Sequence, residues 1–174
     1  MKNIVLVGFM GTGKTVVAKG LAKRLKMKFA DLDDLIEERE SKKISQIFAE
    51  SGEPYFRQVE KEIVREVSQQ KNRVIASGGG VVLDEENIQN LKRNGIMICL
   101  SAKPEAILER TKGYLHRPLL NTEDPKAKIE ELLKFRAPFY AKANYTIDTS
   151  ELTIEEVIEK VIEISNEAQT YGTK

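Results

Sequence analysis

The sequence predicts an α/β fold built around a mostly parallel sheet of five strands. Short apolar runs alternate with longer amphipathic segments along the 174 residues, as in repeated strand–helix–strand units. The apolar runs are continuous rather than alternating with polar residues, which is typical of strands buried on both faces. The expected strands are residues 3–7, 28–31, 73–76, 96–100 and 145–148, of which 28–31 has the weakest pattern.

The first strand is followed by the segment GFMGTGKT, residues 8–15. Gly8, Gly13, Lys14 and Thr15 match the pattern G-x-x-x-x-G-K-[ST], and a helix-like run follows at once. Glycines let backbone N–H groups approach phosphate oxygens, and a helix N-terminus favours an anion. The alternative is a glycine-rich turn that happens to precede a lysine. The strand–loop–helix context favours binding of a nucleoside triphosphate.

Carboxylates follow the second predicted strand, in the segment ADLDDLIEE. Asp31 and Asp33 share one face of an extended chain, because alternate residues of a strand point the same way. Open α/β sheets bind ligands at the carboxyl ends of their strands, so this pair can serve a metal ion and an acceptor together. Alternatively, Asp33 only caps the helix that follows.

The segment GEPYFRQVEKEIVREV predicts an amphipathic helix in which Arg57 and Glu60 are one turn apart. Taken alone, this pair is typical of an ion pair on a helix surface. The next predicted strand ends in SGGG, residues 77–80. Three glycines after a buried strand allow a ligand to approach the backbone closely, and a loose loop is the alternative.

The segment TKGYLHRPLLNTED, residues 111–124, has no clean periodicity and predicts a lid over the site. It contains Arg117, and the later segment FRAPFY contains Arg136. Arginine is suited to bidentate binding of a carboxylate or phosphate, although a lone arginine is more often a solvated charge. From these residues alone we expect a small phosphotransferase, with an anionic acceptor as one possibility.

The C-terminal part of the chain predicts a helix that packs on the sheet. Apolar residues between Ile154 and Ile164 follow the helical period, and Thr153 with Glu156 forms a capping-box pattern. No linker, repeat or low-complexity segment interrupts the chain. We therefore expect one domain that covers residues 1–174.

Composition narrows the classes of function. The net charge of +1 indicates no nucleic-acid or membrane partner, and no apolar run approaches the ~20 residues of a membrane span. The one cysteine, Cys99, excludes a disulfide within the chain and is expected as a buried thiol, and the one histidine, His116, leaves no Ser-His-Asp arrangement. We expect a cytoplasmic protein and, because no extended apolar element is left over, a monomer.

Taken together, these motifs resemble those of the shikimate kinase family. GFMGTGKT, DLD, GEPYFRQVE, SGGG, RPLL and RAPFY occur in the order and approximate spacing of that family, over residues 3–150. The resemblance implies a three-layer α/β/α P-loop kinase fold with a mobile lid and a shikimate-binding region at about residues 32–60. It also implies transfer of the ATP γ-phosphoryl group to the 3-hydroxyl of shikimate, with Mg²⁺, on the route to chorismate and the aromatic amino acids.

On the donor side, the resemblance implies that Lys14 and Thr15 handle the phosphates and Mg²⁺ and that Asp31 holds water in the Mg²⁺ shell. Arg117 would neutralise the γ-phosphate when the lid closes, and Arg110 lies where the family often has an arginine that stacks on adenine. The phosphate-binding residues expected in the loop are Gly11, Thr12, Gly13, Lys14 and Thr15.

On the acceptor side, the resemblance implies that Asp33 binds the shikimate hydroxyls and is the candidate base. Arg57, Arg136 and the backbone at Gly79 would hold the substrate, with both arginines on its carboxylate. Glu60 would orient Arg57. By this analogy the catalytic residues are Lys14, Asp33 and Arg117.

Two rival functions follow from the same phosphate loop. One is another small P-loop kinase, for a nucleoside monophosphate or for gluconate, and the pair of arginines with the glycine triplet favours a small carboxylate instead. The other is a nucleotide-dependent switch. The chain lacks the guanine-selective pattern N-K-x-D, which disfavours a GTPase switch.

Overall fold

Five parallel strands form one sheet in the computed structural model, which describes residues 1–112 and 122–171. The strand order is β2-β3-β1-β4-β5, and every neighbouring pair is parallel. All five predicted strands are present, and the fourth extends one residue further at each end than predicted. The strands are β1 (Asn3–Val7), β2 (Lys28–Asp31), β3 (Arg73–Ala76), β4 (Gly95–Ser101) and β5 (Tyr145–Asp148).

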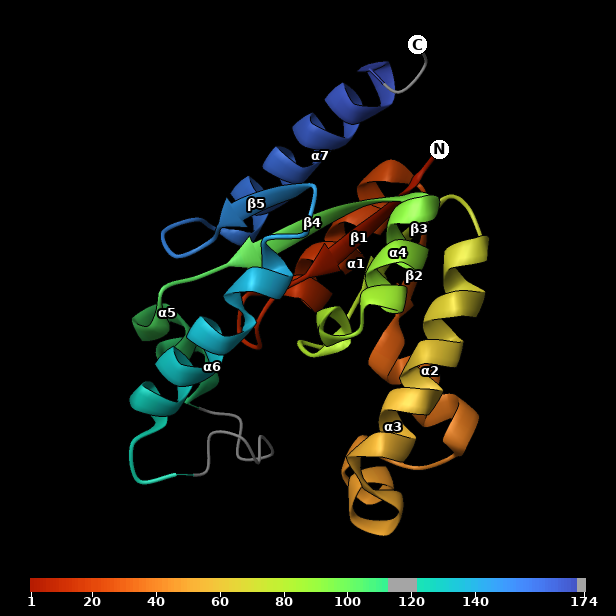
Figure 1. Ribbon diagram of the computed structural model, residues 1–174. Helices are drawn as coiled ribbons and strands as arrows, with labels where there is room; N and C mark the ends of the chain where they lie inside the picture. Colours follow the sequence, from red (N-terminus) through yellow and green to blue (C-terminus); the bar gives the residue numbers. More distant parts are fainter. Residues whose placement is uncertain (113–121, 172–174) are drawn as a thin grey trace.

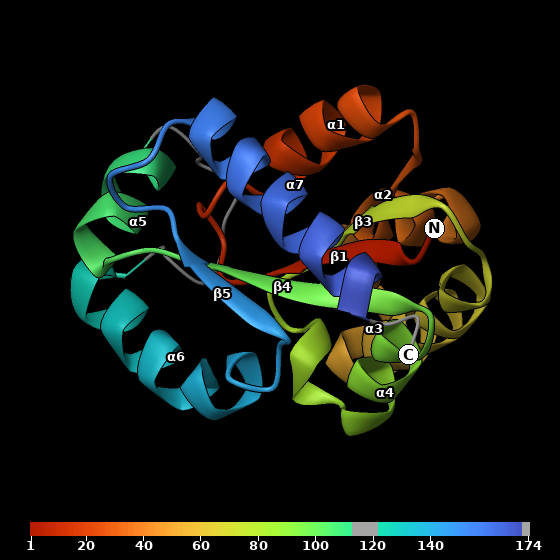
Figure 2. The same ribbon diagram turned by 90° about the horizontal axis from the view of Figure 1, so that it is seen from above.

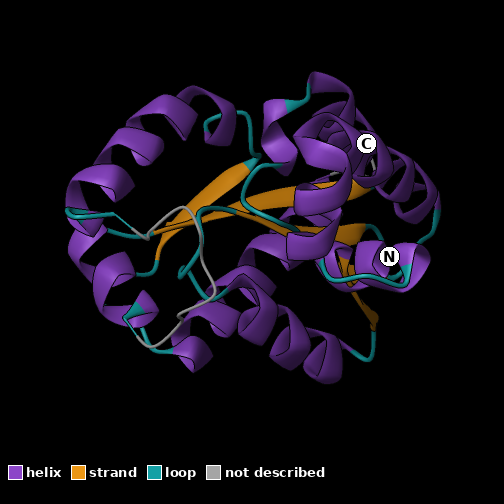
Figure 3. Ribbon diagram, turned by 90° about the horizontal axis from the view of Figure 1, so that it is seen from below, coloured by secondary structure: helices purple, strands orange, loops and turns teal. Residues whose placement is uncertain are grey.

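Helices lie on both faces of this sheet, so the described part of the chain has the three layers that were predicted (Figure 3). A short 3₁₀ turn, Val81–Leu83, follows the glycine triplet. No helix in the described ranges combines the length and apolar character needed to cross a membrane. The helices are α1 (Lys14–Leu25), α2 (Leu32–Glu40), α3 (Ile44–Gln69), α4 (Glu85–Arg93), α5 (Pro104–Thr111), α6 (Pro125–Tyr140) and α7 (Ile154–Tyr171).

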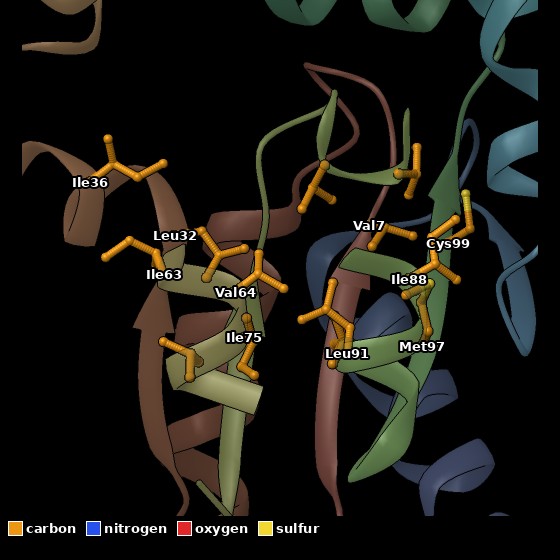
Figure 4. Close-up of a cluster of buried hydrophobic side chains, with 14 of the residues drawn as sticks. Val7, Leu32, Ile36, Ile63, Val64, Ile75, Ile88, Leu91, Met97 and Cys99 are labelled. Atoms are coloured by element: carbon orange, nitrogen blue, oxygen red, sulfur yellow. The ribbon is translucent and has the colours of Figure 1, made fainter. Parts of the chain in front are cut away.

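The three central strands, β1, β3 and β4, are buried on both faces, which explains why they read as continuous apolar runs. In β1, Ile4 and Leu6 pack in a cluster with α1 and α7, whereas Val5 and Val7 pack in a second cluster with α3 and α4. Figure 2 shows α1 and α7 on one side of the sheet and α3, α4 and α6 on the other. Cys99 belongs to the second cluster, as expected for a buried thiol (Figure 4).

The helix α3 begins earlier than the sequence predicts. It runs from Ile44 and is interrupted at Gly52, whose φ of 80° and ψ of 171° are not helical. Pro54 follows this break, where the missing proline N–H removes no bond that the second half of the helix needs. The predicted helix after Gly52 is therefore confirmed, and a shorter helical segment precedes it.

Three of the predicted motifs follow three neighbouring strands. The phosphate loop follows β1, the glycine triplet follows β3, and the aspartates lie at the end of β2 (Asp31) and just after it (Asp33), with β3 between the other two strands. In Figure 1, α2–α3 and α5–α6 extend past the sheet on opposite sides. The predicted lid, 111–124, falls mainly on residues 113–121, which lie outside the described residues, as do Arg117 and His116.

Candidate active site

A cleft of about 630 Å³ lies at the carboxyl ends of the strands and brings together the predicted motifs that fall on described residues. Thr12 is the exception among the described candidates, because its buried hydroxyl donates to the Phe9 carbonyl (2.8 Å) and it does not line the cleft. Ten of the predicted site residues line it: Gly11, Gly13, Lys14, Thr15, Asp31, Asp33, Arg57, Gly79, Arg110 and Arg136.

The phosphate loop has a backbone that requires glycine. Gly8, Gly11 and Gly13 have φ values of 141°, 76° and 90°, which side chains disfavour. A Cβ at Gly8 would also collide with the Leu100 carbonyl oxygen of the neighbouring strand. Lys14 begins α1 and donates from Nζ to the Phe9 carbonyl at 2.8 Å, so the ammonium group lies against its own loop. The loop and its lysine can therefore surround an anion at the start of a helix.

Asp31 connects the second strand to the phosphate loop. Its Oδ2 accepts a hydrogen bond from the Thr15 hydroxyl at 3.0 Å, and its Oδ1 accepts one from the backbone N–H of Asp33 at 3.0 Å. Asp31 is thereby the N-cap of α2, so the alternative that Asp33 caps this helix is wrong. Burial raises the pKa of Asp31 despite these hydrogen bonds. A hydroxyl beside a carboxylate is a fitting donor set for Mg²⁺, which prefers oxygen ligands.

Asp33 is a largely buried carboxylate with an unsatisfied acceptor. Its Oδ1 has no hydrogen-bond partner among the described residues. Burial, together with the charges of Asp31 and Glu60, raises the pKa of Asp33 to about 6, and the charge of Lys14 opposes this rise. Buried acceptors are rarely left unpaired in proteins, so this oxygen is well placed to bind a donor on a ligand.

Arg57 and Glu60 form a partly buried ion pair at the wall of the cleft. Arg57 Nη1 lies 2.8 Å from Glu60 Oε1, and the Glu60 side chain is 2% exposed. Because Glu60 is buried, the interpretation of this pair as an ordinary surface ion pair is wrong. Glu53, one turn earlier, accepts two further bonds from the guanidinium, each at 3.2 Å. The two carboxylates hold Arg57 in a defined position.

Arg136 is buried beside the phosphate loop. Its side chain comes from α6, its guanidinium carbon lies 5.6 Å from the centre of the Phe9 ring, and the residue is 8% exposed. Its Nε has no partner in the part of the chain that the structure describes. A buried arginine with an unused donor is suited to a carboxylate or phosphate of a ligand.

The glycine triplet provides space for the charged side chains of the acceptor site. A Cβ at each of these glycines would lie only 2.5 to 3.1 Å from a functional side-chain atom, which is tighter than most real Cβ contacts. Gly78 lies against Asp33, Gly79 against Arg136 and Gly80 against Arg57. The SGGG segment is therefore a packed part of the site, and the alternative of a loose loop is wrong.

Arg110 lies at the end of α5 and is held by the loop that follows β5. Its Nη2 donates to the Thr149 carbonyl at 2.6 Å, and its Nη1 donates to the Thr149 hydroxyl at 3.0 Å. A longer contact, 3.5 Å, joins it to the Gly11 carbonyl. Thr149 was not among the predicted site residues, because its only sequence signal is its place after a strand.

The sequence also missed apolar residues of the cleft. Ile44 and Phe48 come from the part of α3 before Gly52, and Phe48 packs on Phe56 with ring centres 4.7 Å apart. The early segment ISQIF is too short to show a helical period, so the break at Gly52 concealed it. The lining residues that were not predicted as site residues are Met10, Val16, Ile44, Phe48, Phe56, Glu60, Ser77, Gly78 and Gly80.

Comparisons with known proteins agree with this arrangement. The family model described as shikimate kinase matches residues 10–166. The shikimate kinase of Caldanaerobacter subterraneus subsp. tengcongensis is 53% identical over 162 residues, which cover 93% of this chain and 95% of that one. The shikimate kinase of Thermodesulfovibrio yellowstonii is 51% identical over 93% of this chain and 94% of that one. The solved structure of shikimate kinase from Acinetobacter baumannii in complex with shikimate has a TM-score of 0.90 and 38% identity, over 96% of this chain and 94% of that one. The chain belongs to the shikimate kinase family.

Proposed function

We propose that this protein transfers the γ-phosphoryl group of ATP to the 3-hydroxyl of shikimate, giving shikimate 3-phosphate and ADP. The observation that carries the proposal is that one cleft is lined by the phosphate loop together with Asp33, Arg57 and Arg136. Family membership supports the same reaction, which lies on the route to chorismate and the aromatic amino acids.

On the donor side, the loop N–H groups and Lys14 hold the phosphates of ATP. The Thr15 hydroxyl and the Asp31 carboxylate, 3.0 Å apart, would hold Mg²⁺, Asp31 through a water molecule. When bound, Mg²⁺ neutralises part of the charge on the phosphates. Arg110 takes the adenine side, where Thr149 anchors it.

On the acceptor side, Arg57 and Arg136 bind the shikimate carboxylate, and Asp33 accepts a hydrogen bond from the reacting hydroxyl. Phosphoryl transfer needs positioning and charge neutralisation more than a strong base, so a carboxylate with a pKa near 6 suffices to orient the hydroxyl and take its proton. Arg117 completes the proposal as the cation over the γ-phosphate. Cytoplasmic location and a monomeric state stay predictions.

Release of ADP with a panel of acceptors tests the function. Shikimate should stimulate ADP release with Mg²⁺, and gluconate and AMP should not. Phosphorylation of either rival acceptor without phosphorylation of shikimate would refute the proposal, and absence of stimulation by any acceptor would favour a nucleotide switch.

Lys14→Met should lower shikimate turnover at least ~100-fold, since it removes the phosphate-binding ammonium. Lys19→Met, at an exposed lysine of the same helix, is the matched control.

A further inference from the structure

All three carbonyl groups of the glycine triplet accept hydrogen bonds within the protein. The Gly78 carbonyl accepts from the N–H of Val81 at 3.4 Å, and the Gly80 carbonyl accepts from the N–H of Leu83 at 3.0 Å. Both donors belong to the 3₁₀ turn that follows directly. The Gly79 carbonyl is different, because it accepts from the hydroxyl of Tyr140 at 2.7 Å, a side chain 61 residues later in the chain.

Each carbonyl of the triplet therefore already has a donor, whereas two of its N–H groups do not have an acceptor in the part of the chain that the structure describes. Within the described residues, no acceptor pairs with the N–H groups of Gly79 and Gly80. The peptide between these glycines is planar and trans, so its N–H points away from the carbonyl that Tyr140 holds. A bond to that carbonyl therefore sets the direction of the neighbouring N–H.

Tyr140 also connects the loop to the helix that carries Arg136. The two residues are one turn apart on α6, and both lie close to Gly79. Tyr140 is 8% exposed and does not line the cleft, so it is not placed to touch a ligand. Burial raises the pKa of the Tyr140 hydroxyl to about 12, and the neighbouring Arg136 lowers it in part. The hydroxyl therefore keeps its proton and donates at any physiological pH.

We propose that Tyr140 is a positioning residue for the acceptor substrate. By holding the Gly79 carbonyl it fixes the spacing between Arg136 and the glycine triplet and directs the N–H of Gly80 toward an oxygen atom of the bound acid. This role rests on the proposed function, because it assigns Tyr140 to the shikimate half of the same cleft.

The test is Tyr140→Phe, which keeps the buried ring and removes only the hydroxyl. The KM for shikimate and its Kd from calorimetry should rise about tenfold, since a buried carbonyl loses its donor. The KM for ATP should stay within about twofold, because the phosphate loop is untouched. Tyr145→Phe is the matched control, because Tyr145 is exposed and its hydroxyl makes no hydrogen bond to the described residues.

A carboxylate-blocked substrate separates positioning from general stability. Wild type should strongly prefer shikimate over its methyl ester, and this preference should shrink several-fold in Tyr140→Phe if Arg136 is misplaced. An unchanged shikimate KM in Tyr140→Phe, or an equal rise of both KM values with a lowered melting temperature, would overturn the positioning role while wild-type turnover still supports the kinase. Absence of shikimate turnover by wild type would overturn the proposed function itself.

Discussion

At the scale of single residues, the burial of the Asp33 carboxylate lowers the stability of the folded protein. One oxygen of the largely buried carboxylate has no partner among the described residues, and burial, with the charges of two further carboxylates, raises its pKa to about 6. Groups with such shifted pKa values are concentrated at functional sites. The burial depends on Gly78, 45 residues later, so no local pattern around Asp33 could have revealed it.

Asp33→Asn should make the protein more stable and less active. A folded pKa raised from 3.8 to about 6 means that the stability linked to Asp33 is full below pH 4 and is lost as the pH rises through 6. The amide of the variant does not ionise, so the variant avoids this loss. The melting temperature of Asp33→Asn should therefore exceed that of the wild type by a margin that grows between pH 4.5 and pH 7 to about 5 °C and then levels off. Turnover of shikimate should fall at least ~100-fold.

Thermal unfolding followed by circular dichroism at several pH values measures this effect. Asp34→Asn is the control, because the neighbouring Asp34 is exposed. A gain that is the same at every pH would show that Asp33 has an ordinary pKa in the folded protein.

Gly80→Ala should disturb the acceptor site through Arg57. The new Cβ would lie 2.5 Å from Nη2 and 2.7 Å from Nη1 of Arg57, and the flexible arginine would move aside and lose its bond to Glu60. We expect the KM for shikimate to rise about tenfold, with the KM for ATP unchanged. Because Gly80→Ala acts through the Arg57 side chain, the double variant Arg57→Ala/Gly80→Ala should have a KM for shikimate no higher than that of Arg57→Ala alone. Additive losses in steady-state kinetics would contradict this route.

At the scale of elements, the break in α3 separates what the sequence predicted from what it did not. The half after Gly52 was predicted, because its apolar residues repeat over four turns. The half before it was missed, although it brings Ile44 and Phe48 to the cleft. The phosphate loop was recognised from the sequence because its pattern fixes the residue type at set spacings, although Thr12 of this loop does not line the cleft.

Gly52→Ala should destabilise the protein by about 1–3 kcal/mol. A φ of 80° with a ψ of 171° is a conformation that only glycine adopts readily. The unfolding midpoint in urea should fall, and the KM for shikimate should rise because Phe48 moves. Ser51→Ala, at the exposed neighbouring position, is the matched control. Equal midpoints for the two variants would show that the break tolerates a side chain.

At the scale of the whole molecule, the strands were predictable and the contacts between distant segments were not. The central strands β1, β3 and β4 are continuous apolar runs because helices cover both faces of the sheet there. By contrast, the burial of Glu60 and the bond from Tyr140 to Gly79 depend on how α3, α6 and the β3 loop meet in space. The motifs that contain these residues do not indicate which of them meet in the folded protein.

Cys99 reports on the cooperative unfolding of this core. It is 3% exposed, burial raises its pKa to about 11, and it is the one cysteine of the sequence. The native protein should react with a thiol reagent at least ~100-fold more slowly than the protein in guanidinium, because the thiolate is the reactive form. ATP and shikimate should slow the reaction further by stabilising the folded state. Fast labelling of the native protein would show local opening of β4, and Cys99→Ala gives the background.

The strand order has a consequence for acceptor choice. Because β3 lies between β1 and β2, the phosphate loop after β1 and the segment after β2 that carries Asp33 are two interstrand spacings apart, about 10 Å. Backbone hydrogen bonds set that separation, so no exchange of side chains can change it. A variant of this scaffold that phosphorylates a larger or smaller acid must therefore change the lengths of the side chains on α3 and α6, because the distance between these two segments stays constant.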